Sequence, residues 1–186
     1  MRQVAGVLLT GGASRRMGSP KSRLLVNGET LAKRSARVLS AVCDPVIEVG
    51  PSVSGLPAVQ EDPPGAGPLV AVLAGVGALG NPRTVIVLAC DLPFIDPALL
   101  RLLMEWPGTG TVIPVVGGRY QYACARYGST ALDEAPRALQ SGASSLRSLA
   151  SADCSYLTEE EWGGVVTADV FTDVDTPDDL RRLGLA

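Results

Sequence analysis

The residues best suited to chemistry lie near the N-terminus, in a glycine-containing loop at positions 10–21 that follows an apolar run. Glycine lets a backbone approach a ligand closely, and consecutive N–H groups in such a turn form an anion-binding hollow. Arg16 and Lys21 add positive side chains to the same loop. A backbone hollow combined with side-chain cations predicts a polyphosphate ligand. The candidate backbone donors are those of Leu9, Thr10, Gly11 and Gly12.

Two common phosphate-binding motifs do not fit this loop. A Walker loop needs a glycine, four further residues and then Gly-Lys-Ser/Thr, whereas Gly18 comes one position too late after Gly12 and precedes a serine. The dinucleotide fingerprint Gly-x-Gly-x-x-Gly does not match either. The alternative is a surface loop whose arginines are only solvated, since glycine-rich loops are common.

Three aspartates occupy positions where a ligand could bind. Asp91 follows a continuous β-branched run, typical of a central parallel strand, and open α/β sheets bind ligands at the carboxyl ends of such strands. Asp62 precedes the glycine-rich start of an apolar helix expected at 68–79, a combination that suits base or ribose recognition. Asp175 precedes the helix start Thr176-Pro177, which does not need an acid at position 175 for capping. Turn and capping roles are the alternatives for Asp62 and Asp91.

The composition limits the chemistry further. The 186 residues include no histidine, which excludes histidine acid–base catalysis, Ser-His-Asp triads and histidine-ligated metals, so a bound metal should be a hard cation held by carboxylates. The net charge of −3 argues against a general nucleic-acid-binding protein. Four widely spaced cysteines without a Cys-x-x-Cys pair predict reduced, buried thiols in a cytoplasmic protein. We expect neither a signal peptide nor a membrane span.

The order of elements predicts an α/β fold, a three-layer α/β/α sandwich with a Rossmann-like, mostly parallel sheet, as one domain over residues 1–186. One strand among residues 111–126 should run antiparallel. The loop after the first strand, Asp62 and Asp91 should converge at the carboxyl ends of the strands. Expected strands cover 4–9, 45–49, 58–61, 84–89, 111–115 and 119–126. Expected helices cover 31–42, 68–79, 131–139 and 144–149, and two more start at Pro97 and Pro177.

Four motifs together resemble those of the molybdenum cofactor guanylyltransferases, the MobA family. The first, Leu-x-Gly-Gly-x-Ser-x-Arg-Met-Gly-x-x-Lys, covers positions 9–21, with Thr10 where the family usually has alanine. The others are an acid shortly before Gly67-Pro68-Leu69, the segment Asp91-Leu92-Pro93-Phe94, and Arg119-Tyr120-Gln121, which matches the family's Arg-x-Gln although Tyr122 replaces the proline that commonly follows.

The tail departs from that pattern. Asp173-Val174-Asp175-Thr176-Pro177 resembles the related cytidylyltransferases (MocA), since the guanylyltransferases usually have Asn-x-Asn-Thr-Pro. Against the cytidylyltransferases, the chain has Gly67-Pro68-Leu69 and Asp91-Leu92-Pro93 rather than Gly-Met-Ser and Asp-Gln-Pro. The choice of guanine as the nucleotide base therefore depends on the resemblance and not on a physical argument.

The resemblance implies a fold of the nucleotide-diphospho-sugar transferase type, and transfer of GMP from GTP to the terminal phosphate of molybdopterin with release of pyrophosphate. It implies Arg16, Lys21 and Asp91 as catalytic residues, with Arg16 and Lys21 neutralising the triphosphate. It further implies that Asp91 and Asp175 hold Mg²⁺ and that Asp62 contacts the nucleoside. The substrate phosphate is its own nucleophile, so no protein nucleophile is needed.

Three alternatives stay open at this point. The first two keep the chemistry: a cytidylyltransferase of the same cofactor pathway, or a sugar-phosphate nucleotidyltransferase. The third is a non-catalytic GTP-binding protein that docks on other cofactor-assembly proteins. Neither nucleic acid nor a membrane is expected as a partner.

Overall fold

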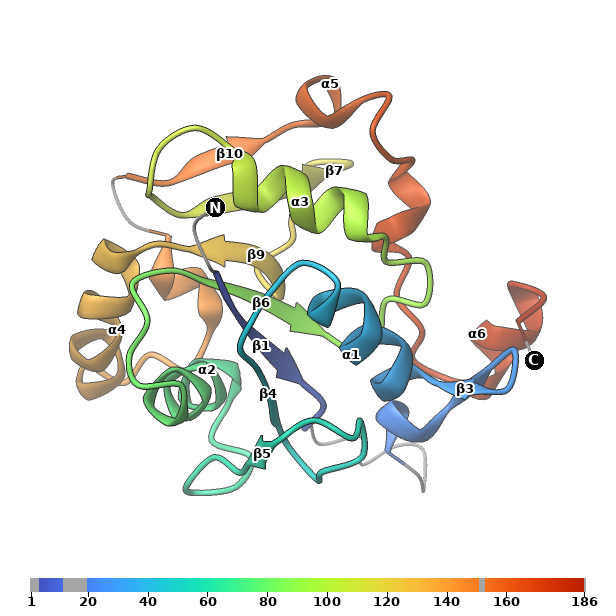
Figure 1. Cartoon of the computed structure of the whole chain (residues 1–186), viewed down its shortest axis with the longest axis horizontal. Coiled ribbons are helices and arrows are strands. Elements are labelled where there is room, and N and C mark those ends of the chain that lie inside the picture. The colour runs from blue at the N-terminus through green and yellow to red at the C-terminus, as the bar shows by residue number, and fades with distance from the viewer. Residues whose placement is uncertain (1–3, 12–19, 151–152, 186) are drawn as a thin grey trace.

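The computed structural model describes residues 4–11, 20–150 and 153–185. Within these residues, eight strands form one sheet in the order β10-β7-β9-β6-β1-β4-β5, with β8 paired to β7 (Figure 1). A separate hairpin pairs β2 (Leu25–Val26) with β3 (Glu29–Thr30). The strands of the main sheet are β1 (Ala5–Leu9), β4 (Val46–Val49), β5 (Ala58–Val59), β6 (Val85–Ala89), β7 (Val112–Val116), β8 (Arg119–Tyr120), β9 (Cys124–Tyr127) and β10 (Ser155–Leu157).

The sheet is mostly parallel, as predicted. β1 pairs in parallel with β4 and β6, β4 pairs in parallel with β5, and β10 pairs in parallel with β7. β9 runs antiparallel to both β6 and β7, which confirms an antiparallel strand within the predicted stretch. Every residue of β1 is buried, as expected for a central strand covered on both faces.

Helices cover the two faces of the sheet and complete three layers, which confirms the predicted fold class (Figure 1). One face carries α1 and α3, and the opposite face carries α2 and α4. The helices are α1 (Leu31–Ser40), α2 (Pro68–Ala78), α3 (Pro97–Glu105), α4 (Ser129–Gln140), α5 (Glu159–Trp162) and α6 (Pro177–Arg182), and the 3₁₀ turns are η1 (Lys21–Arg23), η2 (Leu146–Leu149) and η3 (Ala168–Phe171).

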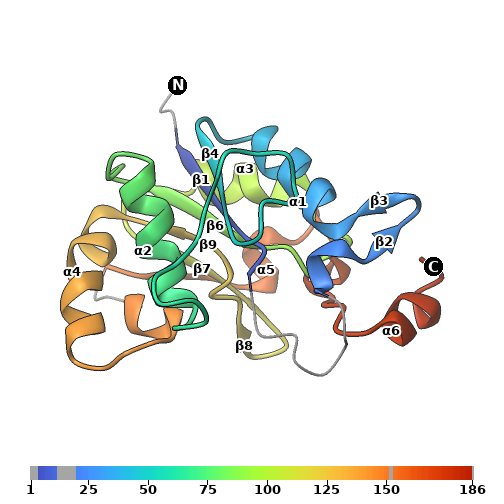
Figure 2. The ribbon, with the colours of Figure 1, turned by 90° about the horizontal axis from the view of Figure 1, so that it is seen from below.

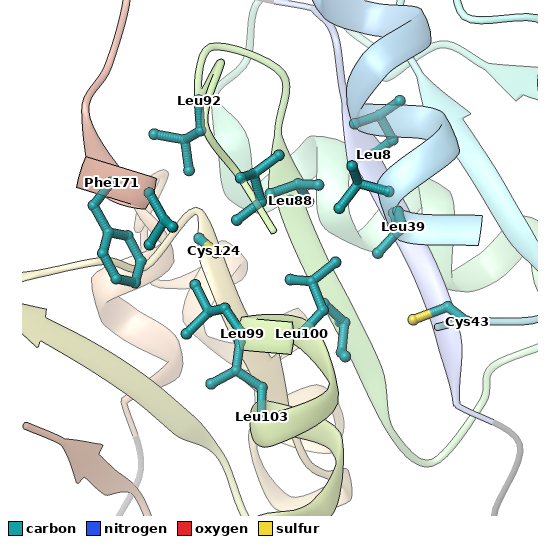
Figure 3. Packing of buried hydrophobic residues seen from close by; sticks show 14 of the residues in the cluster. Leu8, Leu39, Cys43, Leu88, Leu92, Leu99, Leu100, Leu103, Cys124 and Phe171 are labelled. Carbon is teal, nitrogen blue, oxygen red and sulfur yellow. The ribbon is translucent and has the colours of Figure 1, made fainter. Parts of the chain in front are cut away.

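The core on the α1/α3 face is built largely from aliphatic side chains, because the chain has few aromatic residues. Leu8 and Leu88 of the two central strands are completely buried against Leu39 of α1 and Leu99 and Leu103 of α3 (Figure 3). All four cysteines carry free thiols, three of them buried. None of the described helices is both long and apolar enough to cross a lipid bilayer.

A small third cluster ties the C-terminal part of the chain to the hairpin. Val26 and Leu31 pack with Val174 and Leu180, and Val174 is completely buried. Figure 2 shows α6 beside the β2–β3 hairpin, away from the helices α2 and α4. This packing decides where residues 173–175, just before α6, lie.

Three local predictions were wrong in their details. The expected strand at 119–126 is interrupted after β8, because Cys124 donates its N–H to Gln121 O (3.0 Å) in a turn between β8 and β9. The expected helix at 144–149 is the 3₁₀ turn η2. The strand expected at 58–61 ends at Val59, so the two acids that follow it lie in a loop.

Candidate active site

Lys21 lies at the start of η1 and points toward two carboxylates. Its Nζ is 3.8 Å from Asp91 Oδ2, and it forms an ion pair and hydrogen bond with Asp175 Oδ1. Lys21 and Asp91 are therefore neighbours across one cleft, as the sequence predicted, although 70 positions separate them along the chain.

Asp91 is positioned by the end of β6 and by the segment that leads into α6. Cys90 donates its N–H to Leu9 O (3.1 Å), which joins the ends of β6 and β1. Val174 donates its N–H to Asp91 O (2.9 Å), so residues 173 and 175 flank the point where the tail meets β6. Arg34 of α1 donates from Nε to Pro93 O and holds the turn that follows Asp91.

The local structure around Asp175 follows from helix capping. Thr176 is the N-cap of α6; its Oγ1 accepts from Asp179 N (3.2 Å), and Asp179 Oδ2 accepts from Thr176 N (2.7 Å). Asp175 takes no capping role with its carboxylate, which is more than half exposed and faces Lys21. As predicted, capping of α6 does not require an acid at this position.

The electrostatics of the cleft reflect burial and opposite charge. Burial raises the pKa of the Asp91 carboxyl above its ordinary value, and the nearby Lys21 ammonium opposes that rise. For Lys21, burial disfavours the ammonium, but the hydrogen bond to Asp175 and the charge of Asp91 outweigh it, so its pKa lies above the ordinary value. Lys21 is a permanent cation at neutral pH.

Two hollows meet at Asp91. One, of about 270 Å³, is lined by Thr10, Gly11, Lys21 and Pro68 as well as by Asp91. The other, of about 380 Å³, shares Asp91 with the first, and its walls also include Arg119, Tyr120, Gln121 and Asp173. A reaction between two bound molecules could take place where these hollows join.

Comparisons with known proteins assign the chain to a family. The model of the MobA-like NTP transferase domain matches residues 6–161. This range includes most of the sheet and Asp91, which lines both hollows. The chain belongs to the MobA-like NTP transferase family. A protein from Pelotomaculum thermopropionicum, named "Probable molybdenum cofactor guanylyltransferase", is 34% identical over 192 residues, covering 98% of this chain and 92% of the relative.

A second relative in the MobA-like family carries the same name. This protein, from Opitutus terrae, is 38% identical over 159 residues, covering 80% of this chain and 78% of its own. The fold is also that of molybdopterin-guanine dinucleotide biosynthesis protein A from Archaeoglobus fulgidus, with a TM-score of 0.79 at 24% identity over 96% of both chains.

The start of the glycine loop in this MobA-like chain is fixed by Glu48. Glu48 of β4 is completely buried, and its carboxylate accepts from Thr10 Oγ1, Val53 N (3.0 Å), Ser54 N (2.8 Å) and Ser54 Oγ. Burial by itself would raise the pKa of Glu48, but these hydrogen bonds hold it below the ordinary value. The hydroxyl of Thr10 is thus bound to a buried carboxylate.

Backbone donors at the loop start are already in use. Thr10 and Gly11 both donate their N–H groups to Val49 O, at 3.1 and 3.2 Å. An anion hollow that uses these two donors would have to take them from the sheet. Gly12 and Arg16, the other predicted ligands of the triphosphate, lie outside the described residues.

The structure does not bring Asp62 to the Lys21–Asp91 pair. Asp62 is exposed and, among the described residues, is not part of the lining of either hollow. The acid that faces the glycine loop is its neighbour: a Cβ placed on Gly11 would lie 3.7 Å from both carboxylate oxygens of Glu61. Contact of Asp62 with a nucleoside stays a prediction.

The carboxylates of this MobA-like site suit a hard cation. In the described part of the chain no three His, Cys, Asp or Glu side chains are grouped as metal ligands. Asp91 and Asp175 nevertheless share one cation, the Lys21 ammonium, which shows that positive charge between them is favourable. Mg²⁺ is commonly held by one or two carboxylates together with substrate phosphates and water, which fits such a pair.

Sequence reasoning missed two residues of the site. Asp173 lines the hollow beside Arg119 and adds negative charge near both Lys21 and Asp91. The alternating Asp-x-Asp at 173–175 was a sequence signal for Asp173. Its position next to β6, however, depends on the packing of Val174. Glu48 gave a weaker signal, a single charge in an otherwise apolar strand.

Proposed function

We propose that this MobA-like NTP transferase moves GMP from GTP to the terminal phosphate of molybdopterin. The observation that carries the proposal is the placement of Lys21 beside Asp91 at the junction of two hollows. The names and coverage of the two relatives support the choice of substrates. GTP would occupy the hollow beside Thr10, and the acceptor the hollow beside Arg119.

The transfer needs no nucleophile from the protein. An oxygen of the acceptor phosphate attacks the α-phosphorus of GTP, the bond from that phosphorus to the bridging oxygen of the β-phosphate breaks, and pyrophosphate leaves with the electron pair. The protein must hold two anions close together and neutralise charge as it develops on the leaving group. A chain without histidine can do this, because an ionised phosphate requires no general base.

Each side chain then has a distinct role. Lys21 would leave its ion pair with Asp175 to neutralise the phosphates, with Arg16 assisting from the glycine loop. Asp91 and Asp175 would hold Mg²⁺, which when bound supplies charge neutralisation at the phosphate oxygens. Asp62 would contact the nucleoside, which requires a movement of its loop toward the first hollow.

The test is incubation of the protein with GTP, Mg²⁺ and molybdopterin, followed by mass analysis of the pterin product. The expected product carries one added GMP, and pyrophosphate appears in equal amount. Parallel reactions with CTP, ATP and UTP decide the base, since the Asp-x-Asp tail resembles that of the cytidylyltransferases. GTP binding without any transfer would contradict the proposal and favour a non-catalytic role.

A further inference from the structure

We propose that the exposed ring of Tyr120, supported by Tyr122 and Tyr156, is the surface on which the flat heteroaromatic ring of the acceptor stacks. This inference rests on the proposed function, because it assigns the ring-bearing molecule to the hollow beside Arg119. It adds a binding surface beyond the Lys21–Asp91 junction.

The cluster concentrates a scarce kind of side chain at the surface. The chain has four tyrosines, two phenylalanines and two tryptophans, and three of the tyrosines meet here. The ring centroids of Tyr120 and Tyr122 are 5.7 Å apart with an interplanar angle of 29°, and those of Tyr120 and Tyr156 are 5.1 Å apart at 61°. Yet Tyr120 is 50% exposed and Tyr156 is 44% exposed, so the core does not account for them.

The strand register explains why these rings meet. Tyr120 of β8 pairs with Val115, and Tyr156 of β10 pairs with Ile113, on opposite edges of β7. Residues 113 and 115 of one strand point to the same face, and directly paired residues share a face. The two tyrosines therefore stand on one face, either side of β7, and hold each other in place.

The location of Tyr120 indicates what covers the cluster. Tyr120 lines the hollow of about 380 Å³ that Asp91 also lines, so the aromatic surface continues into the candidate site. Arg119 and Gln121 also line this hollow. A molecule with its phosphate near Asp91 could extend its ring over Tyr120.

Stacking on aromatic side chains is a sufficient source of affinity. A tyrosine ring presents a large rigid face with little conformational freedom to lose, and a stacked base is typically worth about 1–3 kcal/mol by alanine substitution. A protein partner is the competing occupant, because tyrosine is common at interfaces. Such a partner would not explain why the surface runs into the hollow at Asp91.

The experiment compares Tyr120→Ala, Tyr120→Phe and Tyr156→Ala with wild type in the GTP and molybdopterin reaction. For Tyr120→Ala, we expect the KM for molybdopterin to rise about tenfold, equivalent to about 1.4 kcal/mol, with the KM for GTP unchanged. Tyr120→Phe keeps the ring and should restore the KM to within about twofold of wild type. Val165→Ala, at an exposed apolar side chain outside the two hollows, is the matched surface control.

The outcomes separate this inference from the proposed function. If wild type forms no dinucleotide product with any nucleotide, the proposed function fails before a variant is compared. If wild type is active and Tyr120→Ala keeps the wild-type KM for molybdopterin, only the inference is overturned. Should Tyr120→Ala lose its circular dichroism signal, Tyr156→Ala decides: a raised KM for molybdopterin supports the stacking surface, and an unchanged one refutes it.

Discussion

Replacing Glu48 by glutamine removes a buried negative charge while keeping the size of the side chain. The carboxylate has no cation partner among the described residues that contact it; five hydrogen bonds from Thr10, Val53 and Ser54 stabilise it instead. In the variant, the amide oxygen can still accept from Ser54 N–H and Oγ. The amide NH₂ then faces Thr10 Oγ1 and Val53 N–H, which both donate in the native protein.

The expected loss of unfolding free energy follows from the number of hydrogen bonds that the variant loses. Thr10 can rotate its hydroxyl to accept, and Val53 N–H keeps its bond to Oε2 (3.1 Å) but loses the one to Oε1 (3.0 Å), so about one charge-assisted interaction is lost. Such interactions contribute about 1.5–3 kcal/mol each, and we expect Glu48→Gln to lower the free energy of unfolding by that amount at neutral pH. Thr10→Val is the matched control, since it removes one donor and leaves the carboxylate with Val53 and Ser54. Thr10→Val should lower the free energy of unfolding by less than Glu48→Gln does.

The pH dependence gives the sharper test. The pKa of Glu48 in the folded protein lies below the ordinary value of 4.5, so the unfolded chain binds the proton more readily. The stabilisation by ionised Glu48 is therefore fully present above pH 4.5 and is lost as the pH falls through the folded-state pKa. The difference in unfolding free energy between wild type and Glu48→Gln should narrow below pH 4.5.

Urea unfolding followed by circular dichroism, at neutral pH and in a series of acidic buffers, measures this difference. A difference that is independent of pH would refute the reasoning, because it would show that the pKa of Glu48 is the same in the folded and unfolded states. A glutamine variant as stable as wild type at neutral pH would also refute it, since desolvation of the charge would then cancel its hydrogen bonds.

Three further substitutions test the site and its support. Lys21→Ala should lower kcat by about 100-fold or more in the transfer assay, because a preorganised cation is lost, whereas a change confined to KM would assign Lys21 to ground-state binding. Gly50→Ala should lower the free energy of unfolding by about 1–3 kcal/mol in urea, since the new Cβ would clash with Thr10 Oγ1 and lie 2.6 Å from Gly11 N; an unchanged midpoint would argue against this close approach. Arg126→Met should lower the free energy of unfolding by about 3 kcal/mol or more, because the buried guanidinium donates to the carbonyls of Leu103 and Trp106 (3.0 and 2.9 Å). A thermal melting temperature equal to that of wild type would contradict this prediction.

The sequence was most informative where one segment carries its own signal. The β-branched run before Asp91 predicted β6 to within one residue, because a strand buried on both faces must be continuously apolar. The helix start at Pro97 was equally local: α3 begins there, and Asp96 Oδ1 caps it by accepting from Ala98 N at 2.7 Å. Such signals depend on neighbours in the chain rather than on the fold.

The parts that could not be predicted depend on contacts between distant segments. Glu48 is identifiable as a network residue only once Thr10 and the loop at 53–54 are seen to surround it. Asp173 reaches the site because Val174 is buried beneath the hairpin and donates to Asp91 O. A spacing pattern contains neither of these long-range pairings.

The central claim is that Asp91, next to Lys21 at the junction of the two hollows, is required for nucleotidyl transfer. The most direct measurement is pyrophosphate release from GTP with Mg²⁺ and molybdopterin, comparing wild type with Asp91→Asn at matched circular dichroism spectra. We expect wild type to release pyrophosphate in step with the dinucleotide product and the folded asparagine variant to release none. Wild-type turnover by Asp91→Asn would contradict the claim.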